Sequence, residues 1–185
     1  AIEGILALKQ QANIAPSAIK QIRLDTFDVA YNIIGGGEEG EKKTIKTKEE
    51  ADHSLPYMLA AAFLDGQVMP EQYQPQRINR QDIQSLLQKV DVNCSEDYSA
   101  RFPQEMVCKV TIETNDDQIF SVEKHDYPGF TTSPASWDQL LQKYQNLTKH
   151  IDGTLAAQIA ETIQQINQKK ITDLTDLLAQ INVHH

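Results

Sequence analysis

The sequence predicts an α+β fold, in which a small antiparallel or mixed sheet packs with helices and is followed by C-terminal helices. Alternation of apolar and polar residues, typical of strands, is confined to the middle of the chain, whereas both ends have the spacing of amphipathic helices. Strands clustered in this way argue against the alternating order that builds a parallel sheet. With 185 residues, 40% of them hydrophobic and 23% charged, the chain is long enough to bury a core.

The first fifteen residues predict the end of a helical segment. The chain opens on AIEGILALKQQ, which is apolar from Ile2 onward and has no capping residue before it. We therefore expect residues 1–15 to be the end of a truncated helical segment from a longer protein. Pro16 prevents the helix from continuing, and an α+β domain is expected over residues 16–130.

The first strand of this domain is predicted over residues 18–27, with Ile22, Leu24 and Thr26 on one face. The triplet Gly35-Gly36-Gly37 follows, and then EEGEKK. This triplet lacks the strand–GxxxxGK[ST]–helix context of a phosphate-binding loop, so a mobile loop is predicted from Gly35 onward.

The stretch ADHSLPYMLAAAFLDG, residues 51–66, predicts a helix with an unusual first turn. Its apolar residues recur at helical spacing, and the helix stops at Asp65-Gly66. Pro56 is tolerated only in a first turn, where its missing N–H costs no hydrogen bond. Ser54 is then the N-cap. This assignment puts His53 and Tyr57 at the exposed mouth of the helix.

The remaining pattern predicts a helix capped by Asn79, a short strand over 91–94, and an antiparallel hairpin with one solvated face. The hairpin sequence is MVCKVTIETNDDQIFSVEK. Residues 131–185 predict C-terminal helices, the first starting at Ser133-Pro134, with apolar faces that need a partner. The sequence alone leaves the final His184-His185 open as native residues or as remains of a purification tag.

Composition excludes several classes of function. A net charge of −9 without a basic stripe argues against nucleic-acid binding. No apolar run is long enough to span a membrane. The two cysteines, Cys94 and Cys108, form no CxxC motif and suit a reducing cytosol. No HExxH motif or Cys/His spacing predicts a metal site.

The start of the 51–66 helix is therefore the candidate site. A helix N-terminus offers unpaired N–H groups and a partial positive charge, which suit a carboxylate. His53 and Tyr57 would add side-chain donors there. The same residues also fit an ordinary helix start, in which Ser54 caps the helix, His53 is solvated and Tyr57 packs with its hydroxyl satisfied. From the residues alone, both interpretations stay open.

The block ADHSLPYMLAAAFLDG resembles the signature of the MmgE/PrpD family, typified by 2-methylcitrate dehydratase. The preceding TKEEADHS, the later YPGF and SPASWDQLLQKYQNL, and the opening AIEGILALKQ occupy matching places, so the resemblance covers nearly the whole chain. It implies a lid domain over residues 16–130, with C-terminal helices over residues 131–185 that pack on the lid or on a missing N-terminal helical domain. The site would lie between the two domains, and the isolated chain would be inactive.

The resemblance implies loss of water from 2-methylcitrate in propionate breakdown, without metal or cofactor. A cytoplasmic homodimer is implied for the full-length protein. His53 and Tyr57 are expected to handle protons, and His53, Ser54 and Tyr57 to bind the tricarboxylate substrate. The alternatives are a related decarboxylase, such as a cis-aconitate decarboxylase, a polycarboxylate isomerase, or a non-catalytic α+β binding or dimerisation module.

Overall fold

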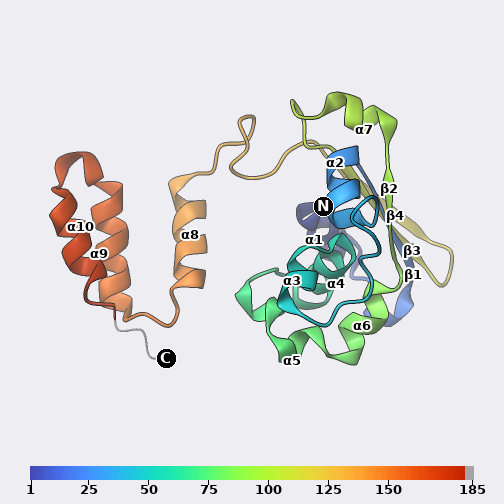
Figure 1. Ribbon diagram of the computed structural model, residues 1–185, viewed down its shortest axis with the longest axis horizontal. Coiled ribbons are helices and arrows are strands. Elements are labelled where there is room, and N and C mark those ends of the chain that lie inside the picture. Colours follow the sequence, from blue (N-terminus) through green and yellow to red (C-terminus); the bar gives the residue numbers. More distant parts are fainter. Residues whose placement is uncertain (182–185) are drawn as a thin grey trace. The chain divides into compact units, whose positions relative to one another are not determined.

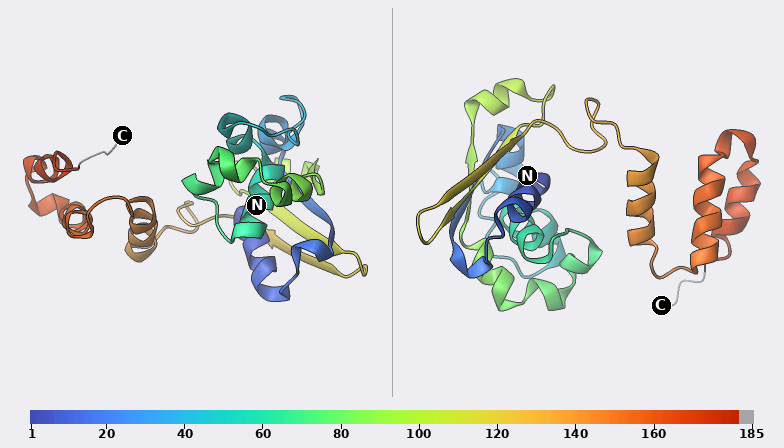
Figure 2. Two further views of the ribbon diagram at one scale, coloured as in Figure 1. Left: turned by 90° about the horizontal axis from the view of Figure 1, so that it is seen from below. Right: turned by 180° about the vertical axis from the view of Figure 1, so that it is seen from behind.

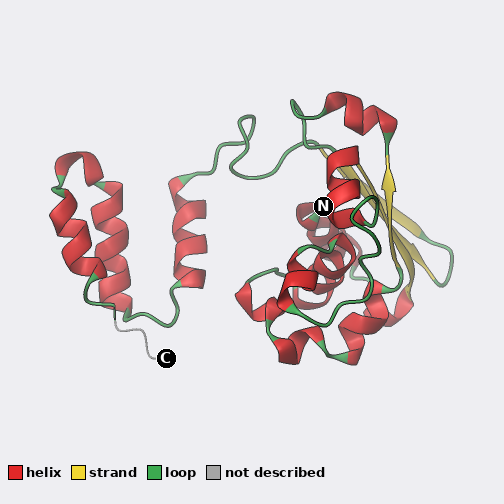
Figure 3. Cartoon of the chain, in the orientation of Figure 1, coloured by secondary structure: helices red, strands yellow, loops and turns green. Residues whose placement is uncertain are grey.

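The computed structural model describes residues 1–181, in two compact units, Ala1–Ser133 and the residues from Pro134 onward (Figure 1). The first unit holds the sheet with its covering helices, and the second is helical (Figure 3). His184 and His185 lie outside the described residues. The expectation of an α+β fold is confirmed.

The first unit is built on a four-stranded mixed sheet with the order β2-β1-β3-β4. The strands are β1 (Ile19–Thr26), β2 (Val90–Cys94), β3 (Cys108–Thr114) and β4 (Ile119–Lys124). β1 pairs in parallel with β2, where Ile22 faces Val90, and antiparallel with β3, where Ile22 faces Ile112. The predicted hairpin is confirmed as β3 and β4.

Helices cover one face of this sheet (Figure 2). α1 packs against β3 and β4, and α4 packs against β2, α1 and α6. α1 belongs to the same compact unit as the sheet. That residues 1–15 are the end of a truncated helical segment stays a prediction. The helices of this unit are α1 (Ile2–Ala12), α2 (Asp28–Ala30), α3 (Lys48–Asp52), α4 (Leu55–Asp65), α5 (Pro75–Ile78), α6 (Gln81–Leu87) and α7 (Glu96–Arg101).

The core lies between α1, α4 and the sheet. Ile22 and Leu24 of β1 are fully buried, as the strand pattern predicted, and so is Leu59 of α4. Gly4 lets α1 approach β3 closely, because a Cβ at this position would lie 2.9 Å from Val110 Cγ2. The opposite face of β1 carries polar residues such as Arg23.

Two predicted helix starts are wrong. α6 begins at Gln81, and Asn79 instead ends α5, where its side-chain amide donates to the Pro75 carbonyl at 2.8 Å. α8 begins after Ser136, which caps it together with Gln139, so the start predicted at Ser133 is three residues early. The loop predicted from Gly35 onward is confirmed from Gly36, directly after a π-helical turn over Tyr31–Gly35.

The second unit contains α8 (Trp137–Leu147), α9 (Gly153–Gln164) and α10 (Ile171–Leu178). Few of its described side chains are buried, chiefly those of Ile159 and Ala160. Large apolar residues are exposed on all three helices, among them Leu140, Ile163 and Ile171. Within residues 1–181, no helix has the length and apolar character needed to cross a membrane.

Candidate functional site

The first turn of α4 is organised by Ser54. The Ser54 Oγ accepts a hydrogen bond from the Tyr57 N–H at 3.0 Å, which confirms Ser54 as the N-cap. The same hydroxyl donates to the carbonyl of Lys42 at 2.6 Å. Pro56 occupies the second position of the helix, where it was predicted. Ser54 therefore fixes both the start of α4 and the loop that runs beneath it.

This arrangement leaves few free donors at the helix mouth. The Tyr57 N–H is taken by Ser54, the Met58 N–H bonds to the Ser54 carbonyl at 2.9 Å, and Pro56 has no N–H. Of this turn, only the Leu55 N–H has no acceptor among the described contacts. A carboxylate at the mouth of α4 would thus need donors from other elements as well.

Tyr57 lies in the core and not at an exposed mouth, so that part of the prediction is wrong. Its side chain is 0% exposed, and its hydroxyl donates to the carbonyl of Gln72. Burial raises the pKa of Tyr57 to about 12, which keeps the phenol protonated at neutral pH. The reason for the burial is packing, because residues 70–73 fold back as a 3-10 turn and bring the Tyr73 ring to 6.1 Å from that of Tyr57. The role of Tyr57 towards a substrate stays a prediction.

A partly buried ion pair holds Gln72 in place. The Gln72 amide donates to Asp65 at 3.0 Å, and Arg77 binds both Asp65 oxygens at 2.8 Å. Arg77 also reaches Asp82 at 2.9 Å. Hydrogen bonds from Arg77 hold the pKa of Asp65 below its usual range. The Tyr57 hydroxyl is therefore connected, through Gln72, to the hydrogen-bonded network of Asp65 and Arg77 at the other end of α4.

His53 is the exposed member of the predicted site. It ends α3, and its side chain is 65% exposed. Nδ1 lies 2.5 Å from Asp52 Oδ1 and 3.1 Å from the Glu49 carbonyl. Because both partners are acceptors, they orient Nδ1 as the protonated nitrogen. Nε2 has no partner among the described residues, so it is the nitrogen that can exchange a proton with a ligand.

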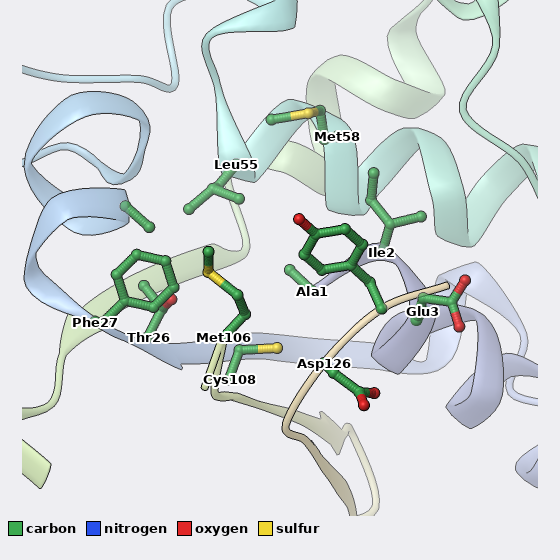
Figure 4. A pocket seen from close by; sticks show the side chains of 12 residues that line it. Ala1, Ile2, Glu3, Thr26, Phe27, Leu55, Met58, Met106, Cys108 and Asp126 are labelled. Carbon is green, nitrogen blue, oxygen red and sulfur yellow. The ribbon is translucent and has the colours of Figure 1, made fainter. Parts of the chain in front are cut away.

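An apolar cavity of about 320 Å³ opens beside the same turn of α4 (Figure 4). Leu55 and Met58 form one wall, and the cavity is also lined by Cys108, the first residue of β3, and by Met106 just before this strand. The carboxylates of Glu3 and Asp126 lie at its periphery (Figure 4). The lining is completed by Ala1, Ile2, Thr26, Phe27, Ala30 and Tyr127.

Residues 1–169 match the model of the MmgE/PrpD C-terminal domain. The chain belongs to the MmgE/PrpD family. It is similar to the cis-aconitate decarboxylase of Mus musculus, with 27% identity over 99 residues, which cover 54% of this chain and 20% of that protein. It is also similar to the cis-aconitate decarboxylase of Homo sapiens, with 24% identity over 131 residues, which cover 70% of this chain and 26% of that protein. The matched region thus spans about a quarter or less of these relatives.

Within this MmgE/PrpD domain the predicted site residues are split between two environments. Ser54 and Tyr57 are buried on the core side of α4, whereas His53 faces solvent on α3. Sequence reasoning missed the cavity residues Met106 and Cys108. The alternating pattern around Met106 and Cys108 predicted a strand, but it did not predict that the start of this strand lies beside α4. In the described part of the chain, no group of three or more His, Cys, Asp or Glu side chains is arranged to hold a metal ion.

Proposed function

We propose that this chain forms one wall of the active site of a lyase that acts on a small tricarboxylate, and that the reaction is loss of water from 2-methylcitrate. The observation that carries the proposal is the match to the MmgE/PrpD C-terminal domain over residues 1–169. It is supported by the position of the first turn of α4, which carries the family signature and lines the apolar cavity.

Such a reaction needs a base to remove a proton next to a carboxylate and an acid to protonate the departing hydroxyl. His53 Nε2, exposed and without a protein partner among the described residues, is proposed as one of these groups. The Tyr57 phenol stays protonated and is proposed as a donor, which requires that it exchange the Gln72 carbonyl for the substrate. Ser54 and the Leu55 N–H are proposed to hold a carboxylate at the helix mouth, which requires that the Ser54 hydroxyl exchange the Lys42 carbonyl for the substrate.

Other parts of the proposal concern the full-length protein. A helical domain N-terminal to Ala1 would supply the other wall and most of the donors that the mouth of α4 lacks. We propose a cytoplasmic homodimer that needs neither metal nor cofactor, and an isolated chain without activity.

Decarboxylation of cis-aconitate is a second candidate, favoured by the names of the two curated relatives. The two reactions differ in what leaves the substrate. The full-length protein should be incubated with 2-methylcitrate, citrate and cis-aconitate while double-bond absorbance and released CO₂ are followed. Double-bond formation from 2-methylcitrate without CO₂ supports dehydration, and CO₂ from cis-aconitate supports decarboxylation.

The site assignment is tested by His53→Ala and Tyr57→Phe in the full-length protein. Each variant should lower turnover at least about tenfold, the scale of a lost acid–base or donor group. His150→Ala, at an exposed position of the second unit, serves as the control and should retain activity. Wild-type turnover in both site variants would overturn the assignment. A full-length protein inactive on the whole panel would favour a non-catalytic binding module.

A further inference from the structure

A second cavity, of about 600 Å³, lies on the other side of the first turn of α4. Pro56 lines it, whereas Leu55 and Met58 line the apolar cavity. The cavity opens along β2, which is an edge strand paired only with β1. Its remaining wall comes from the end of the π-helical turn and the loop after it, and its lining includes Gln21, Arg23, Lys42, Lys43, Asp91 and Asn93.

Three cations converge on this cavity, although the chain as a whole carries a net charge of −9. They are Arg23, Lys42 and Lys43, and the two carboxylates beside them, Glu41 and Asp91, are already occupied by protein donors. Asp91 accepts from Lys43 Nζ at 2.7 Å and from a glutamine amide of β1 at 2.6 Å, and these bonds hold its pKa below the usual range. Glu41 accepts from the N–H of Lys43 and from the next N–H along the chain.

Two of these cations, Lys42 and Arg23, are not fully paired with carboxylates of the described residues and can bind a ligand. Lys42 makes no ion pair within the part of the chain that the structure describes. Among residues 1–181, the guanidinium of Arg23 has a single carboxylate partner, Asp25, at 3.3 Å through Nε, and its side chain is half exposed. The fork of terminal nitrogens on Arg23 can therefore still bind an oxyanion in a bidentate manner.

The loop that carries the lysines is held by side chains outside it. The Lys42 carbonyl accepts from Ser54 Oγ at 2.6 Å, and the Lys43 carbonyl accepts from the Gln88 amide at 2.8 Å. Lys43 Nζ also donates to the Gln88 carbonyl at 3.1 Å. These bonds fix the backbone at residues 42 and 43, so that the lysines need little reordering to bind a ligand.

We propose that this polar cavity is a binding site for a small polyanion with carboxylate or phosphate groups, distinct from the apolar cavity. Arg23 binds one oxyanion group through its terminal nitrogens, and Lys42 binds a second. The inference does not depend on the proposed lyase reaction, since it concerns binding to this chain alone.

The test is an NMR titration of the 185-residue chain with citrate and, separately, with pyrophosphate, at constant ionic strength so that general screening is unchanged. Amide shifts are expected at Gly35, Gly36, Lys42 and Lys43. Arg23→Gln and Lys42→Gln should each raise the dissociation constant about tenfold, which is the effect expected from losing one charge-assisted hydrogen bond. Lys143→Gln makes the same charge change on the exposed surface of α8 and is the matched control.

The two ligands identify the source of the oxyanion. Saturable shifts with citrate alone support a carboxylate ligand, and saturable shifts with pyrophosphate alone support a phosphate ligand. The proposal is overturned if neither ligand shifts these amides, or if Lys143→Gln weakens binding as much as Lys42→Gln does. Amide spectra of the variants without ligand establish that each is folded. Shifts confined to Ser54–Met58 would support the helix mouth as a substrate site while contradicting the polar cavity.

Discussion

Replacing Tyr57 by Phe tests how the first turn of α4 is held in the core. The substitution keeps the fully buried ring and removes only the hydroxyl, which donates to the Gln72 carbonyl. Leaving a buried acceptor without its donor costs about 1–3 kcal/mol, and we expect about 1–2 kcal/mol because the ring packing is unchanged. At about 2.1 cal/mol/K of unfolding entropy per residue, a unit the size of Ala1–Ser133 should lose about 4–7 °C in Tm.

The assay is differential scanning calorimetry of the chain at pH 7, combined with urea unfolding. Tyr73→Phe is the matched control, because the Tyr73 ring lies 6.1 Å from that of Tyr57 but its hydroxyl has no hydrogen-bond partner in the described structure. Its Tm should change by less than about 2 °C, as expected for a change that removes no internal hydrogen bond. Equal losses in the two variants would refute the reasoning that the Gln72 contact stabilises the core.

Three further changes probe the same region. Ser54→Ala should lower the unfolding free energy by about 1–2 kcal/mol in urea, because it removes the helix cap and the bond to the Lys42 carbonyl; an unchanged midpoint would contradict this. Arg77→Leu should cost about 1.5–3 kcal/mol, because the partly exposed Asp65 is left without its bidentate partner; a loss below about 1 kcal/mol would show that water replaces the pair. Since the folded-state pKa of Asp65 is depressed, its contribution is present above about pH 4 and is lost as pH falls through the folded pKa. The destabilisation by Asp65→Asn should therefore be largest at pH 7 and shrink towards pH 2, whereas a constant difference would argue against the ion pair.

The parts of the fold that the sequence predicted are those determined by local chemistry. The alternation of Ile22 and Leu24 predicted the buried face of β1, because successive side chains of a strand point to opposite sides. Pro56 determined the start of α4, since a proline further inside would remove a hydrogen bond. The first-turn position of Pro56 in turn predicted Ser54, two residues earlier, as the N-cap.

One local signal was present in the sequence and was not used. Thr47 and Glu50 have the spacing of a capping box, and the structure has both of its reciprocal bonds at the start of α3. Recognising this box would have separated α3 from α4. His53 would then have been placed at the end of the shorter helix, where its ring bonds to Asp52, and not on the mouth of the longer one.

The burial of Tyr57 could not be predicted in this way. A first-turn position limits how far the residue lies from the helix end, but not which neighbouring element covers it. Its hydroxyl partner, Gln72, is fifteen residues away, in a turn that Asp65 and Arg77 hold in place. The residues of α4 alone therefore do not predict that this turn packs over Tyr57. The same limit applies to Met106 in the apolar cavity, which depends on how β3 passes α4.

Ser54 links the features on either side of α4, which makes it more than a helix cap. One hydroxyl accepts from the Tyr57 N–H on the core side and donates to the Lys42 carbonyl on the side of the polar cavity. A serine hydroxyl can do both because it has a donor hydrogen and acceptor lone pairs, whereas an aspartate cap could only accept. Ser54→Asp should therefore keep α4 capped but release the Lys42 loop. If the polar cavity depends on that loop, Ser54→Asp will weaken citrate or pyrophosphate binding while the helix signal in circular dichroism is retained. Unchanged affinity in a folded Ser54→Asp variant would show that the loop positions its lysines without help from the cap.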